Sequence, residues 1–427
     1  MCTDWEHAMV GEIGQVQLGR QRSPATDSGS YMVPYLRVAN VYDGFIDYSN
    51  TYSMNFSPAE QERYFLERGD ILLNEGQSLE LVGRSAIFTG PSRTYCFQNT
   101  LVRFRAGHRT LSGFARAIFK RWLDIGHFTT IAKQTTSVAH LGANRFACLR
   151  FPLAPLPEQQ KIAEVLDTVD EAIRKTEAIL AKLKQVKQGL LHDLLTRGID
   201  DNGELRDPER HPEQFKDSPL GRIPKGWRRG RLGDEAEVFN GTTPSRALDC
   251  YWGGTVPWLS SGKVNDYRIV TPSEHITDLA LSETSLRVVP RGSVVVGLIG
   301  QGKTRGMTAR TEIDTTINQN LCAIIPHPEV SGVYLHLFLH YHYQKLRGGG
   351  RGSNQDALNC GLVREFPIVV PPLEEQESIA DAIESFEARY EHEEEVISKL
   401  KELKSGLMED LLTGRVRVTP LLEGAPR

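Results

Sequence analysis

The sequence predicts an α+β protein in which a mixed α/β globular unit followed by one long helix occurs twice. A motif at residues 156–163 recurs at 373–380, and Asp-Leu-Leu-Thr at 193–196 recurs at 410–413. Both repeats lie 217 residues apart, from Gln159 to Gln376 and from Thr196 to Thr413, so no insertion separates the copies. Between the two motifs, non-polar residues recur every three or four positions over about five heptads, which is typical of a coiled-coil helix.

The predicted seam of each long helix consists of eight side chains. They are Ile162, Leu166, Val169, Ile173, Leu180, Leu183, Leu190 and Leu194 in the first helix, and Ile379, Ile383, Phe386, Tyr390, Ile397, Leu400, Leu407 and Leu411 in the second. Each helix would be roughly 60 Å long. Because the two patterns match, we expect the helices to pair as an antiparallel coiled coil. Polar residues interrupt the seam at Thr176, Lys187, Glu393 and Lys404. These residues either fix the register or face a partner subunit, and the sequence leaves both open.

The repeat extends beyond the helices into the globular units. Trp5 and Trp227 are each followed by a glycine fourteen residues later, Gly19 and Gly241. Aliphatic runs at residues 70–73 and 293–296 predict buried strands, residues 100–105 predict a half-exposed strand, and residues 112–124 and 331–346 predict helices. Prolines at the unit ends predict helix starts. We therefore divide the chain into 1–152 (first globular unit), 153–198 (first long helix), 199–226 (an ordered-to-extended linker), 227–367 (second unit), 368–415 (second long helix) and 416–427 (tail).

Composition restricts the classes of function. The 427 residues are 40% hydrophobic and 24% charged, which is ordinary for globular domains, and the net charge of −4 does not favour nucleic-acid binding by bulk positive charge. A local basic face remains compatible with this balance. Neither a signal peptide nor a run of about 18 non-polar residues occurs, so we expect a cytoplasmic protein without a membrane span. The six cysteines form no CxxC pair, and we expect small buried thiols.

Several motifs carry a resemblance to a known family. They are residues 156–163 with their repeat 373–380, 34–41, 71–77 with 82–84, 98–105, 219–227, and 241–245 with 251–254. In this order and duplicated, they make the chain resemble the specificity subunit of Type I restriction-modification enzymes over nearly its whole length.

The resemblance implies a non-catalytic reader of double-stranded DNA. Each globular unit would be a target-recognition domain for one half of a split site. The paired helices would fix the gap between the half-sites and dock two methyltransferase subunits, and restriction/translocase subunits would join them. No cofactor is expected in this chain, whereas S-adenosylmethionine and ATP with Mg would be bound by the partner subunits.

Polar side chains in the predicted loops are candidates for DNA contact, because Arg or Lys can bind guanine and Asn or Gln can bind adenine. The candidates are Arg37, Asn40, Asn74, Arg84, Gln98 and Asn99 in the first unit, and Ser245, Arg246, Ser260, Ser261, Lys263, Gln301, Lys303, Arg305, Gln319 and Asn320 in the second. A solvated or turn-capping role is equally open for each of them. A scaffold without DNA contact is an alternative for the whole chain.

A second alternative is a P-loop NTPase, because residues 297–304 match GxxxxGK[ST] after a predicted strand. That chemistry needs a helix starting at Lys303, but an early glycine follows at Gly306, and the corresponding residues 74–78 lack the motif. A chance match in a strand–loop–strand is favoured, and in that case Gln301, Lys303 and Arg305 could face DNA. Neither half of the sequence contains a Ser/His/Asp, Cys/His or paired-carboxylate arrangement in surroundings typical of a catalytic site.

Two further features are weaker. His336, His340 and His342 lack nearby ligands for a metal site, and we expect them to line a polar helix face together with neighbouring tyrosines. The glycine-rich run at 348–353 is compatible with a loop on the DNA backbone or with a simple helix terminator.

Overall fold

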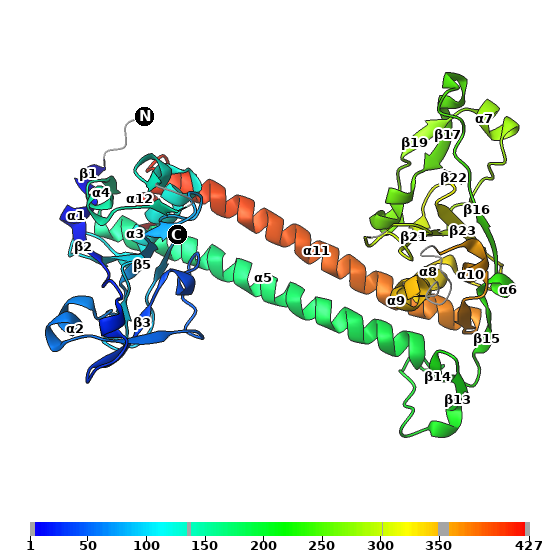
Figure 1. Ribbon diagram of the computed structural model, residues 1–427, viewed down its shortest axis with the longest axis horizontal. Helices are drawn as coiled ribbons and strands as arrows, with labels where there is room; N and C mark the ends of the chain where they lie inside the picture. Colours follow the sequence, from blue (N-terminus) through cyan, green and yellow to red (C-terminus); the bar gives the residue numbers. More distant parts are fainter. Residues whose placement is uncertain (1–4, 135–137, 301, 349–357, 423–427) are drawn as a thin grey trace. The chain divides into compact units, whose positions relative to one another are not determined.

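Residues 5–134, 138–300, 302–348 and 358–422 are described in a computed structural model (Figure 1). The chain divides into two units, one made of residues 1–178 and 394–427 and the other of residues 179–393. The long helices α5 (Leu156–Thr196) and α11 (Leu373–Leu412) have 41 and 40 residues, and each begins in one unit and ends in the other. Their positions agree with the duplication expected from the sequence.

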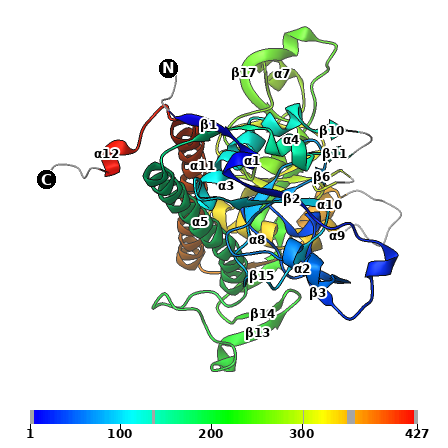
Figure 2. The ribbon, with the colours of Figure 1, turned by 90° about the vertical axis from the view of Figure 1, so that its left-hand side faces the viewer.

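The globular part of the first unit is built from short strands and four α-helices that precede α5. The strands are β1 (Glu6–Met9), β2 (Gly14–Leu18), β3 (Met32–Leu36), β4 (Tyr52–Asn55), β5 (Ile71–Asn74), β6 (Gly76–Gln77), β7 (Ser85–Ile87), β8 (Cys96–Phe97), β9 (Leu101–Ala106), β10 (Lys133–Gln134), β11 (Ala139–His140) and β12 (Arg150–Leu153). The helices are α1 (Val10–Ile13), α2 (Pro58–Tyr64), α3 (Ser112–Asp124) and α4 (Ala143–Ala147), with 3-10 turns η1 (Pro24–Thr26), η2 (Val38–Asn40) and η3 (His127–Thr130); α12 (Thr419–Leu422) follows α11. Figure 2 shows this unit facing the viewer.

The second unit repeats this plan. Its strands are β13 (Phe215–Ser218), β14 (Gly221–Pro224), β15 (Arg228–Arg231), β16 (Ala236–Asn240), β17 (Trp252–Leu259), β18 (Arg268–Ile269), β19 (Glu274–Ile276), β20 (Val294–Gly297), β21 (Thr308–Thr311), β22 (Thr316–Ile317), β23 (Leu321–Pro326) and β24 (Pro367–Val370). Its helices are α6 (Leu232–Glu235), α7 (Asp278–Glu283), α8 (Gly332–Tyr341), α9 (Tyr343–Gly348) and α10 (Cys360–Arg364), with 3-10 turns η4 (Pro212–Gln214), η5 (Asp249–Tyr251) and η6 (Ser261–Asp266).

Three sheets of the first unit have counterparts in the second, whereas β10-β11-β6 and β13-β14 are each found in one unit. The order β2-β9-β5-β7 in the first unit matches β16-β23-β20-β21 in the second, where β18 adds a fifth strand. The smaller sheet β4-β3-β8 matches β19-β17-β22, and the pair β1-β12 matches β15-β24. The internal duplication is therefore present in the fold as well as in the sequence.

Each main sheet is covered on both faces, which explains why its central strands are continuous aliphatic runs. In β5, Ile71 and Leu73 pack with α3 in one core cluster, whereas Leu72 packs with Leu36 and Phe97 of the smaller sheet. In the second unit β20 alternates in the same way, with Val294 and Val296 in the α8 cluster and Val295 in the cluster of the smaller sheet. Strand β9 is also more buried than the predicted half-exposed strand, since Arg103 is buried and donates to the Phe65 carbonyl oxygen.

The glycines that follow the two tryptophans have a steric role. A Cβ on Gly19 would lie 2.2 Å from the carbonyl oxygen of Gln98, and one on Gly241 would lie 1.8 Å from that of Ile317. Both contacts are to backbone at the end of the third strand of the smaller sheet. The repeated Trp-to-Gly spacing therefore reflects a close approach of two backbone segments in each unit.

Within each unit, the parts of α5 and α11 that belong to it pair in antiparallel fashion (Figure 1). In the first unit Lys404 forms an ion pair with Asp170, and Lys401 with Glu177 at 3.0 Å. In the second unit Lys187 pairs with Glu387 at 2.6 Å. Lys187 and Lys404 are equivalent across the repeat, as are Glu387 and Asp170. The polar seam lysines therefore bridge the two helices within each unit, as the register role requires.

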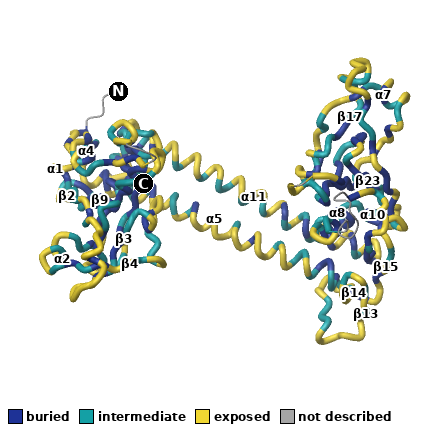
Figure 3. The backbone as a smooth tube through the Cα atoms, viewed as in Figure 1, coloured by how far each residue is buried: buried dark blue, intermediate teal, exposed yellow. Residues whose placement is uncertain are grey.

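All sixteen predicted seam residues are buried or half-buried in the structure (Figure 3). Val169, Leu180, Leu190, Phe386, Tyr390, Ile397, Leu400 and Leu407 are half-buried, and the others are buried. The polar seam position Thr176 is buried as well, whereas Glu393 is half-buried.

A buried glutamine attaches the start of each long helix to its globular unit. The Gln159 side-chain amide donates to the carbonyl oxygens of Ala154 (2.7 Å) and Arg109 (3.0 Å), and its oxygen accepts from the Leu111 amide (2.8 Å). Gln376 repeats all three bonds with Pro371 (2.9 Å), Glu329 (3.0 Å) and Ser331 (2.8 Å). The repeated motif at the helix starts therefore carries a structural contact between helix and loop.

Segment 199–226, predicted as an ordered-to-extended linker, contains an antiparallel hairpin of β13 and β14. The structure corrects two expectations for the secondary structure and the thiols. The helix predicted for residues 331–346 is divided at His342 into α8 and α9. Among the described cysteines, Cys96 and Cys322 are buried as expected, but Cys148 and Cys250 are exposed.

Replacing Gly241 with alanine should destabilise the second unit by about 2–4 kcal/mol, because the new Cβ overlaps a backbone oxygen that cannot rotate away. Gly262→Ala is the matched control, since a Cβ there has no heavy atom within 4 Å. Denaturant unfolding monitored by hydrogen exchange of second-unit peptides measures both. Equal effects of the two changes would contradict the steric role.

Replacing Gln376 with alanine removes three hydrogen bonds and leaves buried backbone groups without partners. We expect a loss of about 2–4 kcal/mol in the stability of the second unit. The exposed Gln160 on the first long helix, whose side chain bonds Glu164, provides the control, because Gln160→Ala should change stability by less than about 0.5 kcal/mol. A wild-type melting temperature in Gln376→Ala would show that the amide is dispensable.

Candidate nucleic-acid interface

Two parallel strands in the first unit end at one edge, and candidate DNA contacts follow both of them. β3 and β8 are parallel, with Leu36 opposite Phe97. Arg37 follows β3 and Gln98 follows β8, and the Gln98 amide donates to the Leu36 carbonyl oxygen at 2.9 Å. The next amide, that of Asn99, bonds the Arg20 carbonyl oxygen at 3.0 Å. Residues about 60 positions apart in the sequence thus lie side by side.

The second unit builds the same edge from β17 and β22. These strands are also parallel, with Leu259 opposite Ile317. Ser260, Ser261 and Lys263 follow β17, whereas Gln319 and Asn320 lie just beyond β22. The Asn318 amide donates to the Leu259 carbonyl oxygen at 3.0 Å, as its counterpart does in the first unit. We call each arrangement a parallel-strand edge.

A further loop lies next to each edge. In the second unit it joins β20 to β21, and the Leu298 amide at its start donates to the Asn320 carbonyl oxygen at 2.9 Å. In this loop Lys303 is exposed and Arg305 is half-buried. In the first unit the corresponding Glu75 amide bonds the Thr100 carbonyl oxygen at 2.9 Å, and the chain then continues to Arg84. The structure therefore brings both groups of predicted contacts together in each unit.

Two of the predicted contacts are buried and are removed from the candidates. Asn40 is 2% exposed, and its amide donates to the carbonyl oxygens of Asp47 and Asn50 while its oxygen accepts from the Arg37 amide. Asn74 is fully buried at the end of β5. Both side chains stabilise the loops behind the edge and do not reach solvent. Their residue type was suitable for adenine, but the sequence does not show which side of the backbone they occupy.

Several other candidates are exposed or half-buried and already have protein partners. Arg246 forms two bonds with Glu274 (2.6 and 2.7 Å) and lies over the Trp252 ring at 3.6 Å, and the bond to Glu274 raises the pKa of Arg246. Lys263 pairs with Asp266 at 2.7 Å. The Gln319 oxygen accepts from the Thr243 hydroxyl at 2.6 Å, Ser260 lies 3.0 Å from the Ser273 hydroxyl, and exposed Ser245 accepts weakly from the Ala247 amide. These bonds pre-orient the side chains, and contact with a ligand at Arg246 requires exchange of Glu274.

Exposed aromatic residues beside arginines are an additional feature that the sequence reasoning missed. Tyr42 and Phe45 stack at 4.8 Å with an interplanar angle of 4°, and the Arg84 guanidinium lies 5.0 Å from the Tyr42 ring. Arg37 lies 4.5 Å from the exposed Tyr52 ring. Aromatic and guanidinium faces can stack on sugars or bases. The high density of tyrosines between residues 31 and 52 is the sequence signal from which this feature could have been predicted.

The loop that matches the P-loop pattern does not form a phosphate-binding structure. Strand β20 precedes it as expected, but the residues after Lys303 form a turn at Gly306 and then β21, where a P-loop needs a helix. Gln301, predicted as a DNA contact in this loop, lies outside the described residues, as does most of the glycine-rich run at 348–353.

Of the three histidines predicted on a polar helix face, His336 and His342 are buried, whereas His340 is half-buried. His336 is buried, with Nε2 3.3 Å from the Thr308 carbonyl oxygen, and burial together with neighbouring His340 lowers the pKa of His336 to about 3. Burial lowers the pKa of His342 to about 4. Tyr334 is buried too, which corrects its predicted place on a polar helix face, whereas Tyr341 and Tyr343 are half-buried. In the described part of the chain, His, Cys, Asp and Glu form no group of three suited to a metal ion.

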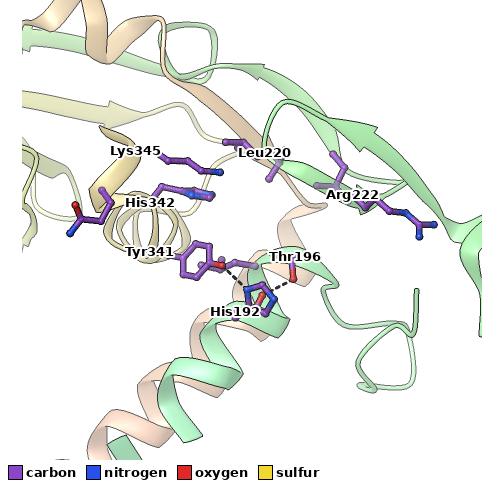
Figure 4. Close-up of a pocket in the computed structure, with 11 residues that line it drawn as sticks. His192, Thr196, Leu220, Arg222, Tyr341, His342 and Lys345 are labelled. Atoms are coloured by element: carbon purple, nitrogen blue, oxygen red, sulfur yellow. Dashed lines mark hydrogen bonds between the residues drawn. The ribbon is translucent and has the colours of Figure 1, made fainter. Parts of the chain in front are cut away.

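A pocket of about 330 Å³ lies away from the parallel-strand edge, where the end of α5 meets α8, α9 and the β13–β14 hairpin (Figure 4). His192 points toward Tyr341 there, and Nδ1 lies 2.6 Å from the phenol oxygen. The position equivalent to His192 in the first unit, Glu409, also contacts the globular part, through Arg121 at 2.7 Å. We assign this pocket to the junction of helix and globular unit, where it is separate from the candidate interface.

The two units therefore share one α+β fold, each with a parallel-strand edge and a pair of antiparallel helix segments, and this defines an internally duplicated protein. The chain belongs to the family described as Type I restriction modification DNA specificity domain, whose model matches residues 3–185 and 224–402. The putative type I restriction enzyme MjaX specificity subunit of Methanocaldococcus jannaschii is 25% identical over 421 residues, which cover 97% of this chain and 94% of that protein.

Solved structures show the same fold. The S subunit of a Type I restriction-modification system from M. genitalium is 12% identical with a TM-score of 0.57, and the match covers 96% of each chain. A structure from work on complex assembly and conformational transition of the type I R-M system is 18% identical with a TM-score of 0.57, covering 96% of this chain and 98% of that one. Among the described residues, no helix combines the length and the non-polar character needed to cross a membrane.

Acid should destabilise the second unit through His336. Its pKa is about 3 when folded and about 6.5 when unfolded, so its contribution is fully present above pH 6.5 and is lost as the pH falls through this window toward 3. In His336→Gln, stability should depend less on pH by up to about 1.4 kcal/mol per pH unit. Hydrogen exchange of second-unit peptides measures this, and the exposed His392→Gln is the control. An unchanged slope in His336→Gln would contradict a buried neutral imidazole.

Proposed function

We propose that this chain is the DNA-reading specificity subunit of a Type I restriction-modification complex, and that it carries out no catalysis itself. Each globular unit reads one half of a split site in double-stranded DNA. The observation that supports this most directly is the parallel-strand edge, which gathers polar and basic side chains at the same place in both units. Family membership and the continuous match to specificity subunits support the same conclusion.

Side chains at the edge supply both kinds of contact that DNA recognition needs. Arg37, Arg84 and Lys303 provide positive charge for phosphates or guanine, and Gln98, Gln319 and Asn320 provide amides for adenine. The backbone at the edge is shared by the units while the side chains differ, since Arg37 corresponds to Ser260 and Glu75 to Leu298. Two such edges would recognise two different half-sites, which corresponds to an asymmetric split target.

The outer surface of the long helices supports a role in assembly. Val186 on α5 is 41% exposed, and its equivalent Leu403 on α11 is 52% exposed. Non-polar side chains repeated at equivalent positions suit two copies of one partner. We assign these copies to methyltransferase subunits that bring S-adenosylmethionine, and we expect restriction/translocase subunits with ATP and Mg to join the complex.

Co-expression with the methyltransferase subunit and sequencing of methylated adenines in the host DNA tests this function. We expect methylation at one bipartite site, and the isolated chain should show no methylation, DNA cleavage or ATP hydrolysis. Exchanging residues 215–367 for the second unit of another specificity subunit should change one half-site and keep the other. Changes in both half-sites, or a complex that binds DNA without sequence preference, would overturn the assignment.

Replacing Gln319 with alanine should weaken binding to the cognate site by about 5- to 100-fold and relax the sequence requirement in one half-site, because the edge loses an amide. Arg210→Ala is the control, since its strongly exposed side chain lies in the 199–226 segment away from the edge. Fluorescence anisotropy with duplexes altered in either half-site measures the effect. Equal losses on both half-sites would argue against an edge-specific contact.

A further inference from the structure

The second unit contains two thiols in direct contact. Cys322 lies in β23, fully buried, with Asn240 of β16 on one side and Val296 of β20 on the other. Cys360 is the first residue of α10 and is half-buried. Their sulfurs are 2.9 Å apart, which is within about 1 Å of a disulfide bond length. The two residues are separated by 38 positions in the sequence, so only the fold brings them together.

Backbone contacts hold α10 at this distance from the sheet. Before it, the Leu358 amide donates to the Leu298 carbonyl oxygen at 3.2 Å. Asn359 caps the helix by accepting from the Leu362 amide at 2.9 Å, and Arg364 at its end donates to the Val238 carbonyl oxygen at 2.5 Å. Contacts to β16 and to the end of β20 therefore fix both ends of the short helix. The thiols are neighbours in a packed core and do not meet through a freely rotating loop.

The two sulfurs differ in reactivity. The hydrogen bond shared with Cys322, together with the nearby Arg364 charge, lowers the pKa of Cys360 below that of an ordinary thiol. The same hydrogen bond and burial raise the pKa of Cys322. A half-buried thiol with a lowered pKa beside a buried thiol is the arrangement of an attacking and a resolving cysteine. Cys148 and Cys250 are exposed and have no such neighbour among the described residues.

The pair is specific to the second unit. Leu358 corresponds to Leu141, which bonds the Glu75 carbonyl oxygen in the first unit as Leu358 bonds that of Leu298. The equivalent of Cys360 is therefore Ala143 at the start of α4. The equivalent of Cys322 on β9 is Val102, because Leu101 faces Asn74 as Leu321 faces Gly297. The same framework packs without sulfur, so structure alone does not require the two thiols.

We propose that Cys322 and Cys360 form a redox-sensitive dithiol that hydrogen peroxide converts into a disulfide. The Cys360 thiolate attacks one peroxide oxygen, the O–O bond breaks, and a sulfenic acid and hydroxide form. The hydroxide takes up the proton that Cys360 released, giving the first water. The Cys322 sulfur then attacks the Cys360 sulfur, the S–O bond breaks, and the hydroxyl leaves with the Cys322 proton as the second water. Two thiols are oxidised by two electrons, and one peroxide is reduced to two waters.

The bond would connect α10 to the central sheet of the second unit. Cys322 is two residues beyond Asn320 in the parallel-strand edge, and Leu358 contacts the start of the loop that carries Lys303. Oxidation therefore acts on the framework behind one candidate interface and leaves the first unit unchanged. The chemistry itself is independent of the proposed function, because it requires only the two thiols and an oxidant.

The full-length reduced chain, treated in the native state with stoichiometric hydrogen peroxide and then alkylated, tests the proposal. We expect a mass decrease of about 2 Da before alkylation, reversed by dithiothreitol. A non-reducing tryptic digest should link peptide 311–345, which contains Cys322, to peptide 352–364, which contains Cys360. The double change Cys148→Ser/Cys250→Ser should retain this link, and Cys360→Ser should abolish it.

Trapping of the intermediate gives a second measurement, which is made first on the unchanged chain. Dimedone present during oxidation should label Cys360 before the link forms, and it should label Cys360 more strongly in Cys322→Ala than in the unchanged chain. Accumulation of sulfinic acid on Cys360 without the link, a link that forms only after unfolding, or preferential linkage through Cys148 or Cys250 would each overturn the proposal.

Discussion

The buried side-chain amide at the start of each long helix connects the helix to its globular unit. Gln159 and Gln376 each contact the turn that leads into the helix and a separate loop, residues 109–111 or 329–331. A helix of 40 residues or more amplifies any change in the angle of its first turn into a large displacement at its other end. Three bonds from one buried amide restrict that angle, because breaking them leaves backbone groups without partners in the core. The direction of each helix relative to its own edge depends on this contact.

An ion pair connects the start of each long helix to the segment that follows the other long helix. Glu158 at the start of α5 pairs with Arg417, which follows α11, and Glu375 at the start of α11 pairs with Arg206, which follows α5. Glu375 also accepts from the Trp227 indole at 3.1 Å. The adjacent glutamate and glutamine thus have different roles. The glutamate binds an arginine in the segment that follows the other long helix, and the glutamine binds the backbone of the loops. The motif repeated in the sequence is a junction that both units need.

Duplication preserved the geometry of the units more strictly than their charges. An ion pair beside each helix start joins Glu6 to Arg109 in the first unit and Arg228 to Glu329 in the second, so the acidic and basic partners have exchanged positions. Exposed ion pairs contribute little to stability, so the acidic residue can stand at either of the two positions. Glycines at the close backbone approach and buried amides cannot vary in this way. The candidate interface shows the same contrast, because the two units share the backbone of the parallel-strand edge but differ in its side chains. One fold could in this way read different half-sites.

The sequence by itself determined the duplication, the two long helices, their seam and the family, because these depend on periodic patterns and on motifs repeated at a constant offset. It also identified most residues of the edge as polar loop residues. Only the tertiary structure decided which of them reach solvent: Asn40 and Asn74 are buried, whereas Lys303 is exposed. Strand pairing likewise decided that Arg37 lies beside Gln98, and the packing of α10 on the sheet decided that Cys322 meets Cys360. Such contacts join positions far apart in the chain, and no local pattern encodes the direction in which a side chain points.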